Sequence, residues 1–366
     1  MGIAIALLAT FSILFFININ DLLAQLAQFQ LWLLLPIVGL KLINWILRYL
    51  EWHYFLHIIN VHPVLRGETR PPSSEHQPAT IRVQDSFILW MASLPFALSP
   101  GKIAEVLKAL ILKNMTQTPM ARSTPIIFAE RLIDGIAVVI IVGAVAALMP
   151  NAIFSAEVLD TNDIRTVIIA ITAFMIGLIT AAQFKPIAYF LIDAIGRVPL
   201  LSRFQAEIRT LYDSSNELTK LRHLLNTTLF GLGAYFSDCI GFYLILLGLG
   251  ESPSATLFAQ ATFILGFSVI ISAISAMPGG AGGREVTIAV MLSSIVGMSK
   301  DAVGAGVLLI GIFQIWLGVV VGILIGLAFY RRLFPPTLFQ NIGQTAKLVA
   351  RDHSFSASQH IQSEQV

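Results

Sequence analysis

Long apolar stretches, separated by polar segments, dominate the chain. A transmembrane helix needs about 20 consecutive, mostly apolar residues. About six stretches approach or exceed that length, and they cover residues 3–19, 31–50, 126–148, 167–182, 224–249 and 303–330. No Lys or Arg precedes the first stretch, which favours a membrane span over a cleaved signal peptide. The pattern therefore predicts about six full transmembrane helices.

Two further apolar stretches are interrupted by Pro and Gly. Residues 87–98 and 103–112 flank Ser99-Pro100-Gly101, and residues 256–276 and 286–296 flank a second run that contains Pro278 and four glycines. Pro and Gly break helices, and the limbs of the first pair are too short to cross a bilayer. We expect two re-entrant helical hairpins, although residues 256–276 alone are long enough to span.

The distribution of charge predicts the orientation. Cations concentrate in residues 185–222 and at Arg331-Arg332, whereas the loop at residues 151–163 is acidic. Cation-rich loops tend to stay in the cytoplasm. Both termini are therefore expected in the cytoplasm, with residues 151–163 outside and the two hairpins entering from opposite sides. Such inverted repeats with paired broken helices are typical of carriers whose site lies near the bilayer midplane.

These features divide the chain into a membrane domain, residues 1–332, and a polar tail, residues 333–366, expected to be a disordered cytoplasmic segment. Within the membrane domain we expect repeat one at about 29–149, a connector at 184–222 and repeat two at about 224–330. Residues 62–85 are polar and proline-rich, and we expect a cytoplasmic loop. Lys41 and Arg48, near the end of the second span, are interpreted as interfacial cations.

Composition supports an all-α integral membrane protein. Charged residues make up 12% and hydrophobic residues 56%, against about 25% charged in soluble domains. The net charge of +2 gives no basic field for nucleic acid. The single cysteine, Cys239, is interpreted as a packing residue, and His53 and His57 as an interfacial helix face. We expect no metal and no cofactor.

Ionisable residues nevertheless fall within the apolar segments: Lys102, Glu105, Lys108, Glu130, Arg131, Asp134, Asp238, Arg284 and Glu285. Each costs about 2.5–3.5 kcal/mol at a helix centre, so they must pair, reach the interface or face water. Glu130 and Asp134 share a helix face and need a cation, for which Lys102 and Arg284 are the candidates. One interpretation is that these charges are ion pairs that hold the hairpins together, and snorkelling would explain Arg131.

The other interpretation is a binding site. Lys102 and Arg284 each follow a Gly break at the start of a half-helix, where free backbone donors favour an anion. The candidate substrate-binding residues are Lys102, Glu105, Glu130, Arg131, Asp134, Arg284 and Glu285. The backbone breaks comprise Pro100, Gly101, Pro278, Gly279, Gly280, Gly282 and Gly283.

The last span carries glycines four residues apart, at Gly318, Gly322 and Gly326. A face of small residues allows another helix to approach closely. We expect this face to pack within the chain, with a homodimer as a further possibility.

Three motifs in order carry a family resemblance. They are Ser99-Pro100-Gly101-Lys102 with Glu105, then Glu130-Arg131-Leu132-Ile133-Asp134, and Pro278-Gly279-Gly280 with Gly283-Arg284-Glu285. Together they resemble the transmembrane region of lysylphosphatidylglycerol synthases, also found as stand-alone flippase-like proteins, over about residues 5–332. The resemblance implies lipid handling. The synthases make their lipid in a separate soluble domain that does not fit in this chain, so we do not expect an enzyme.

Our leading hypothesis is an inner-membrane translocase for an anionic phospholipid or a polyprenyl-phosphate-linked lipid. The alternative is a non-transporting membrane subunit of a lipid-linked glycosyltransferase or of a glycolipid or hopanoid pathway. A third hypothesis is a membrane enzyme that acts on lipid phosphates, with Glu105, Glu130 and Asp134 available for acid–base work. The expected partners are a membrane lipid and a lipid-modifying enzyme, with no nucleic acid.

Overall fold

A computed structural model describes residues 19–71, 78–99, 104–150, 205–275 and 282–334, with a few single positions between 152 and 193. Five helices in these residues are long and apolar enough to cross a membrane: Leu31–Ile58, Met120–Leu148, Leu221–Gly248, Ala255–Ser275 and Lys300–Ala328. The predicted all-α polytopic membrane fold is thereby confirmed. Except for a few single positions, the predicted spans at 3–19 and 167–182 lie outside the described residues.

The described residues of the first part of the chain form two long helices, α3 and α6, together with shorter helices and a small sheet. Its elements are α2 (Ile19–Gln28), η2 (Leu31–Leu33), α3 (Leu34–Ile58), β1 (Val61–Val64), β2 (Ala79–Arg82), α4 (Val83–Ala92), η3 (Leu94–Leu98), α5 (Val106–Thr116) and α6 (Met120–Leu148).

The second part begins with α10 (Gln205–Leu218), which lies in the predicted connector. The elements that follow are α11 (Leu221–Gly248), α12 (Ala255–Ser275), α13 (Gly283–Met291), η7 (Leu292–Val296), α14 (Lys300–Gly311), η8 (Ile312–Trp316), α15 (Leu317–Ala328) and α16 (Tyr330–Leu333). Both η7 and η8 are π-helical turns, and η8 joins α14 to α15 in one long helix.

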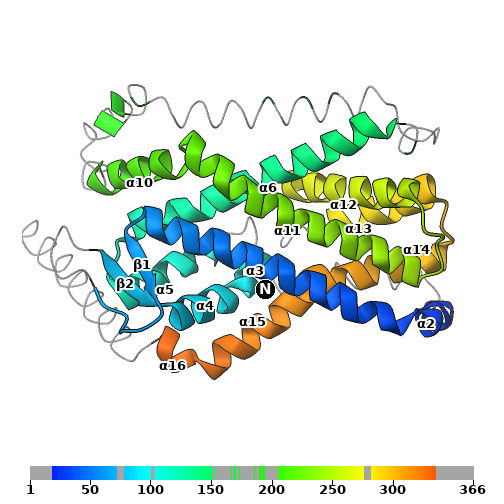
Figure 1. Ribbon diagram of the computed structural model, residues 1–366, viewed down its shortest axis with the longest axis horizontal. Helices are drawn as coiled ribbons and strands as arrows, with labels where there is room; N and C mark the ends of the chain where they lie inside the picture. The colour runs from blue at the N-terminus through cyan, green and yellow to red at the C-terminus, as the bar shows by residue number, and fades with distance from the viewer. Residues whose placement is uncertain are drawn as a thin grey trace, which may run out of the picture.

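The long helices run along the molecule, with α3 packed along α11 and α6 contacting α10, α11 and α12 (Figure 1). Two apolar cores form at opposite ends of this bundle. One contains Phe242 and Phe263, and the other contains Trp52 and Phe55 beside the small sheet. Each of α3, α6 and α11 contributes residues to both cores, and polar residues lie between those two sets along each helix. These polar residues form a layer across the middle of the bundle.

The sheet corrects the expectation of a loop at residues 62–85. β1 and β2 pair in parallel, with Val61 opposite Ala79 and Val64 opposite Arg82. Val61 and Ile81 are fully buried against the C-terminal part of α3 and against α5. Arg82 donates to Asp85 at 2.8 Å, and Asp85 also contacts Arg332 of α16 at 3.7 Å. The described residues of this segment, 61–71 and 78–85, are therefore folded and connect α3, α5 and α16.

The limbs of both predicted hairpins are helical. In the first hairpin they are α4 with η3 and then α5, each shorter than a bilayer span. In the second they are α12 and then α13 with η7, and the 21 residues of α12 suffice to cross. The turns at 100–103 and 276–281 lie outside the described residues, so the re-entrant path of each hairpin stays a prediction.

Candidate functional site

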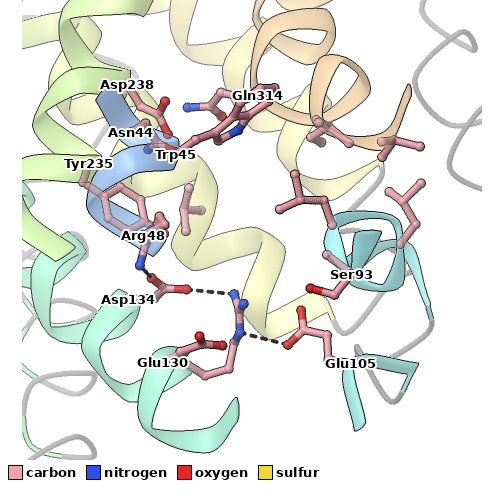
Figure 2. A pocket seen from close by; sticks show the side chains of 18 of the residues that line it. Asn44, Trp45, Arg48, Ser93, Glu105, Glu130, Asp134, Tyr235, Asp238 and Gln314 are labelled. Atoms are coloured by element: carbon pink, nitrogen blue, oxygen red, sulfur yellow. Dashed lines mark hydrogen bonds and ion pairs between the residues drawn. The ribbon is translucent and has the colours of Figure 1, made fainter. Parts of the chain in front are cut away.

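A cavity of about 310 Å³ opens between the two apolar cores. Its wall contains five cations and five carboxylates, namely Lys41, Arg48, Lys108, Arg131, Arg284, Glu51, Glu105, Glu130, Asp134 and Asp238. Figure 2 shows Asp238, Asn44 and Gln314 on one side of it, Glu130 and Glu105 on the other, and Arg48 with Asp134 between them. An apolar section of the wall comes from η3 and α15, including Leu94, Leu98 and Val319.

The cavity lies at the middle of the long helices. Asn44, Asp134, Tyr235 and Gln314 line it, and each is within one residue of the midpoint of its helix, among those bounded by Leu31–Ile58, Met120–Leu148, Leu221–Gly248 and Lys300–Ala328. Helices that cross a bilayer have their midpoints near its centre. An unpaired charge is most costly near the centre of a spanning helix.

On one side of the cavity, an ion pair connects α3 to α11. Lys41 Nζ lies 3.3 Å from Asp238 Oδ1, and both side chains are largely buried. One turn along α3, Asn44 Nδ2 donates to the carbonyl oxygen of Ala234 at 2.9 Å. These contacts correct the interpretation of Lys41 as an interfacial cation, because its charge is neutralised inside the bundle.

Arg48 also lies inside the bundle rather than at an interface. Its Nη1 contacts Glu51 Oε2 at 3.2 Å and forms an ion pair with Asp134, while its guanidinium lies 5.2 Å from the ring centroid of Tyr235. Asp134 in turn accepts a hydrogen bond from Arg131 Nη1 at 2.8 Å. Arg131 Nε lies 3.3 Å from Glu105 Oε2, so Arg131 joins α6 to the start of α5.

Lys108 and Glu130 form a separate pair between α5 and α6. Lys108 Nζ donates to both carboxylate oxygens of Glu130, at 2.8 and 3.1 Å. The same ammonium lies 3.8 Å from the ring centroid of Trp52, within the range of a cation–π contact. Lys108 is thus fixed by a carboxylate and an aromatic face together.

Arg284 occupies the first turn of α13. The preceding Gly282 has a φ of +91°, a backbone conformation that residues with a side chain rarely adopt. Its N–H donates to Glu285 Oε2 at 2.7 Å. Arg284 is 5% exposed and donates to the neutral amide oxygen of Gln314 in the π-helical turn η8. Its Nε has no hydrogen-bond partner within the described ranges.

The structure brings five of the seven candidate residues to one cavity: Glu105, Glu130, Arg131, Asp134 and Arg284. Glu285 instead caps the helix that begins beside it. Lys102 lies outside the described residues, as do Pro100, Gly101, Pro278, Gly279 and Gly280, whereas Gly282 and Gly283 open α13. The cations that contact Glu130 and Asp134 are Lys108, Arg48 and Arg131, and Arg284 contacts Gln314 instead.

Sequence reasoning did not assign Lys41, Asn44, Arg48 and Glu51 to the site. Their spacing of three, four and three residues puts all four on one face of α3. A polar stripe within an apolar span was therefore the signal that could have identified them. Gln314 and Tyr235 carried no comparable signal, because single polar residues of these types are common in membrane helices.

No group of three or more His, Cys, Asp or Glu side chains in the described ranges could hold a metal ion. The cavity wall carries guanidinium, ammonium and carboxylate groups.

Comparison with known families and proteins agrees with the membrane fold. The model of the family described as Lysylphosphatidylglycerol synthase TM region matches residues 1–322. No curated protein and no solved structure matched the chain. The match covers most of the 366 residues, and the chain therefore belongs to the family of the lysylphosphatidylglycerol synthase transmembrane region.

Proposed function

We propose that the protein translocates a lipid with a phosphate-bearing headgroup across the inner membrane. The lipid is a phospholipid or a polyprenyl-phosphate-linked lipid, and its headgroup binds in the charged cavity. The observation that carries this proposal is the position of the cavity at the midpoints of four spanning helices. Ionisable residues at that depth are typical of transport pathways, and carriers hold substrate near the midplane.

Arg284 supports phosphate as the recognised group. Its guanidinium is buried, its hydrogen-bond partner Gln314 carries no charge, and Nε has no partner among the described residues. A guanidinium can bind two phosphate oxygens with parallel hydrogen bonds. The N-terminus of α13 adds the positive end of a helix dipole at the same place.

The size and lining of the cavity support a lipid rather than a soluble anion. About 310 Å³ is at the lower end of the range for small-molecule sites, enough for a headgroup but not for acyl chains. The apolar section of the wall at Leu94, Leu98 and Val319 would direct the chains toward the surrounding bilayer. The family name, which refers to a phospholipid synthase, points to the same class of substrate.

Lipid-induced thermal stabilisation of the purified protein tests this assignment. We expect phosphatidylglycerol to raise the Tm of the wild type and of Arg70→Gln, a control for the loss of an exposed arginine. Arg284→Gln should fold yet gain little from the lipid, and Arg284→Lys should show an intermediate gain, because ammonium binds phosphate through a single point. Equal stabilisation of wild type and Arg284→Gln would remove Arg284 from the binding site.

A further inference from the structure

A chain of alternating charges follows one wall of the cavity. Its five members, in order of contact, are Glu51, Arg48, Asp134, Arg131 and Glu105. Three carboxylates share two guanidiniums, so this chain carries one more negative charge than positive charge. The neighbouring pair of Lys108 and Glu130 is neutral by itself and does not supply the missing cation.

We assign the excess negative charge to Glu51, at the more deeply buried end of this series of ion pairs. The Glu51 side chain is 1% exposed, and Oε2 accepts one long bond, 3.2 Å, from an Arg48 that Asp134 also contacts. Oε1 has no partner in the part of the chain that the structure describes. A buried carboxylate with so few donors is costly when ionised. At the other end, Glu105 is 9% exposed and is paired with Arg131, whose side chain is 40% exposed.

We propose that Glu51 is the binding site of an exchangeable proton. The proton comes from water and binds one carboxylate oxygen, which turns the anion into a neutral carboxylic acid without moving electrons. The new O–H is a donor, and Asp134 is then the one charged partner that the described residues give Arg48. Release of the proton to water restores the competition of Glu51 and Asp134 for Arg48.

The other charged groups around the cavity determine the net charge that the wall has when this proton is bound. They are Lys41 and Arg48 on α3, Glu105 and Lys108 at α5, Glu130, Arg131 and Asp134 on α6, Asp238 and the phenol of Tyr235 on α11, and Arg284 on α13. Among these described residues five cations face four carboxylates once Glu51 is neutral, a difference of 5 − 4 = +1. With Glu51 ionised the difference is zero.

A protonated Glu51 therefore favours an anionic headgroup in the cavity, and a bound anionic headgroup favours the proton. Such linkage is reciprocal by thermodynamic necessity. This linkage rests on the proposed lipid function, whereas the proton site itself does not. The linkage would allow a proton gradient to drive or bias the movement of the lipid.

Infrared difference spectroscopy of the full-length protein in lipid nanodiscs tests the proton site directly. A pH step should reveal the carbonyl-stretch band of a protonated carboxylic acid in the wild type. The band should be lost in Glu51→Gln, which mimics the neutral form, and shifted in Glu51→Asp. Glu68→Gln, at an exposed ion pair, should keep the wild-type band. No such band in the wild type, or a full band in Glu51→Gln, would overturn the proposal.

Binding of short-chain phosphatidylglycerol as a function of pH tests the linkage. Wild-type affinity should fall as pH rises, by up to about tenfold per pH unit for one linked proton. Glu51→Gln should bind with an affinity that does not change over the same range. A pH-independent affinity in the wild type would refute the linkage. A wild type that binds no phosphatidylglycerol would refute the proposed function while leaving the infrared result standing.

Discussion

At the scale of single residues, the pair of Lys41 and Asp238 shows how the bundle tolerates buried charge. The two side chains are 9% and 14% exposed and join α3 to α11 near their midpoints. The attraction within a buried pair roughly offsets the cost of removing both charges from water. Removal of one partner is different, since the remaining charge stays buried without compensation.

We therefore expect Asp238→Asn to destabilise the protein by about 3–5 kcal/mol, because Lys41 then keeps an uncompensated buried charge. Lys41→Met combined with Asp238→Leu should recover most of that loss. Glu68→Gln, which breaks an exposed pair with Arg70, should change stability by no more than about 1 kcal/mol. Denaturant unfolding of the four proteins measures these differences. A single change at Asp238 as mild as the control would contradict the account.

The same residues show how far the sequence predicts a site. Glu105, Glu130, Arg131, Asp134 and Arg284 could be identified because charges in apolar stretches require a role. Their partners could not be, because pairing depends on helix packing: Lys41 and Asp238 are 197 residues apart in the chain. Cations near the end of a span also resemble interfacial anchors, which explains why Lys41 and Arg48 were misplaced.

At the scale of elements, a glycine face lets α15 approach α4 and η3. A Cβ atom at Gly322 would lie 2.6 Å from Pro95 Cδ and 2.7 Å from the backbone oxygen of Met91. Neither atom can move aside freely, because one belongs to a ring and the other to the main chain. The expectation that this face packs within the chain is thereby confirmed, whereas a homodimer stays a prediction.

Gly322→Ala should therefore destabilise the protein by about 1–3 kcal/mol through overpacking. Gly241→Ala is the matched control, because a Cβ there meets nothing within 4 Å. This control should be neutral or stabilising by up to about 1 kcal/mol, as Ala favours helix more than Gly does. Thermal unfolding of both variants gives the comparison. Equal stability of the two would show that the close packing of α15 is not required.

Element prediction from the sequence succeeded for the long apolar helices and failed for the sheet. Hydrophobic length alone identifies spans such as α6 and α11, since few other structures use so many apolar residues. β1 and β2 are four residues each and pair in parallel across an intervening segment, so no local alternation indicates them. The π-helical turn that presents Gln314 also has no local pattern, because it arises from packing.

At the scale of the whole molecule, the two apolar cores flank a charged layer at the middle of the bundle. A bundle that crosses the membrane has one orientation in it. We propose that both termini are cytoplasmic. The cation excess of residues 185–222 and of Arg331-Arg332 supports that side.

Cysteine labelling in intact cells measures the orientation. Cys239 is 1% exposed, so the native thiol should give little background. Asn151→Cys should react with an impermeant maleimide added outside, whereas Ser354→Cys should react only after permeabilisation. Labelling of Asn151→Cys solely after permeabilisation would reverse the proposed topology.

Transport itself is tested most directly by the movement of fluorescent phosphatidylglycerol between the leaflets of proteoliposomes. The wild type and Arg70→Gln should speed the exchange well beyond that of protein-free vesicles. Arg284→Gln, reconstituted in equal amount, should stay near the protein-free rate, because the headgroup loses its buried guanidinium. A wild-type rate equal to that of protein-free vesicles, or an undiminished rate in Arg284→Gln, would contradict the account.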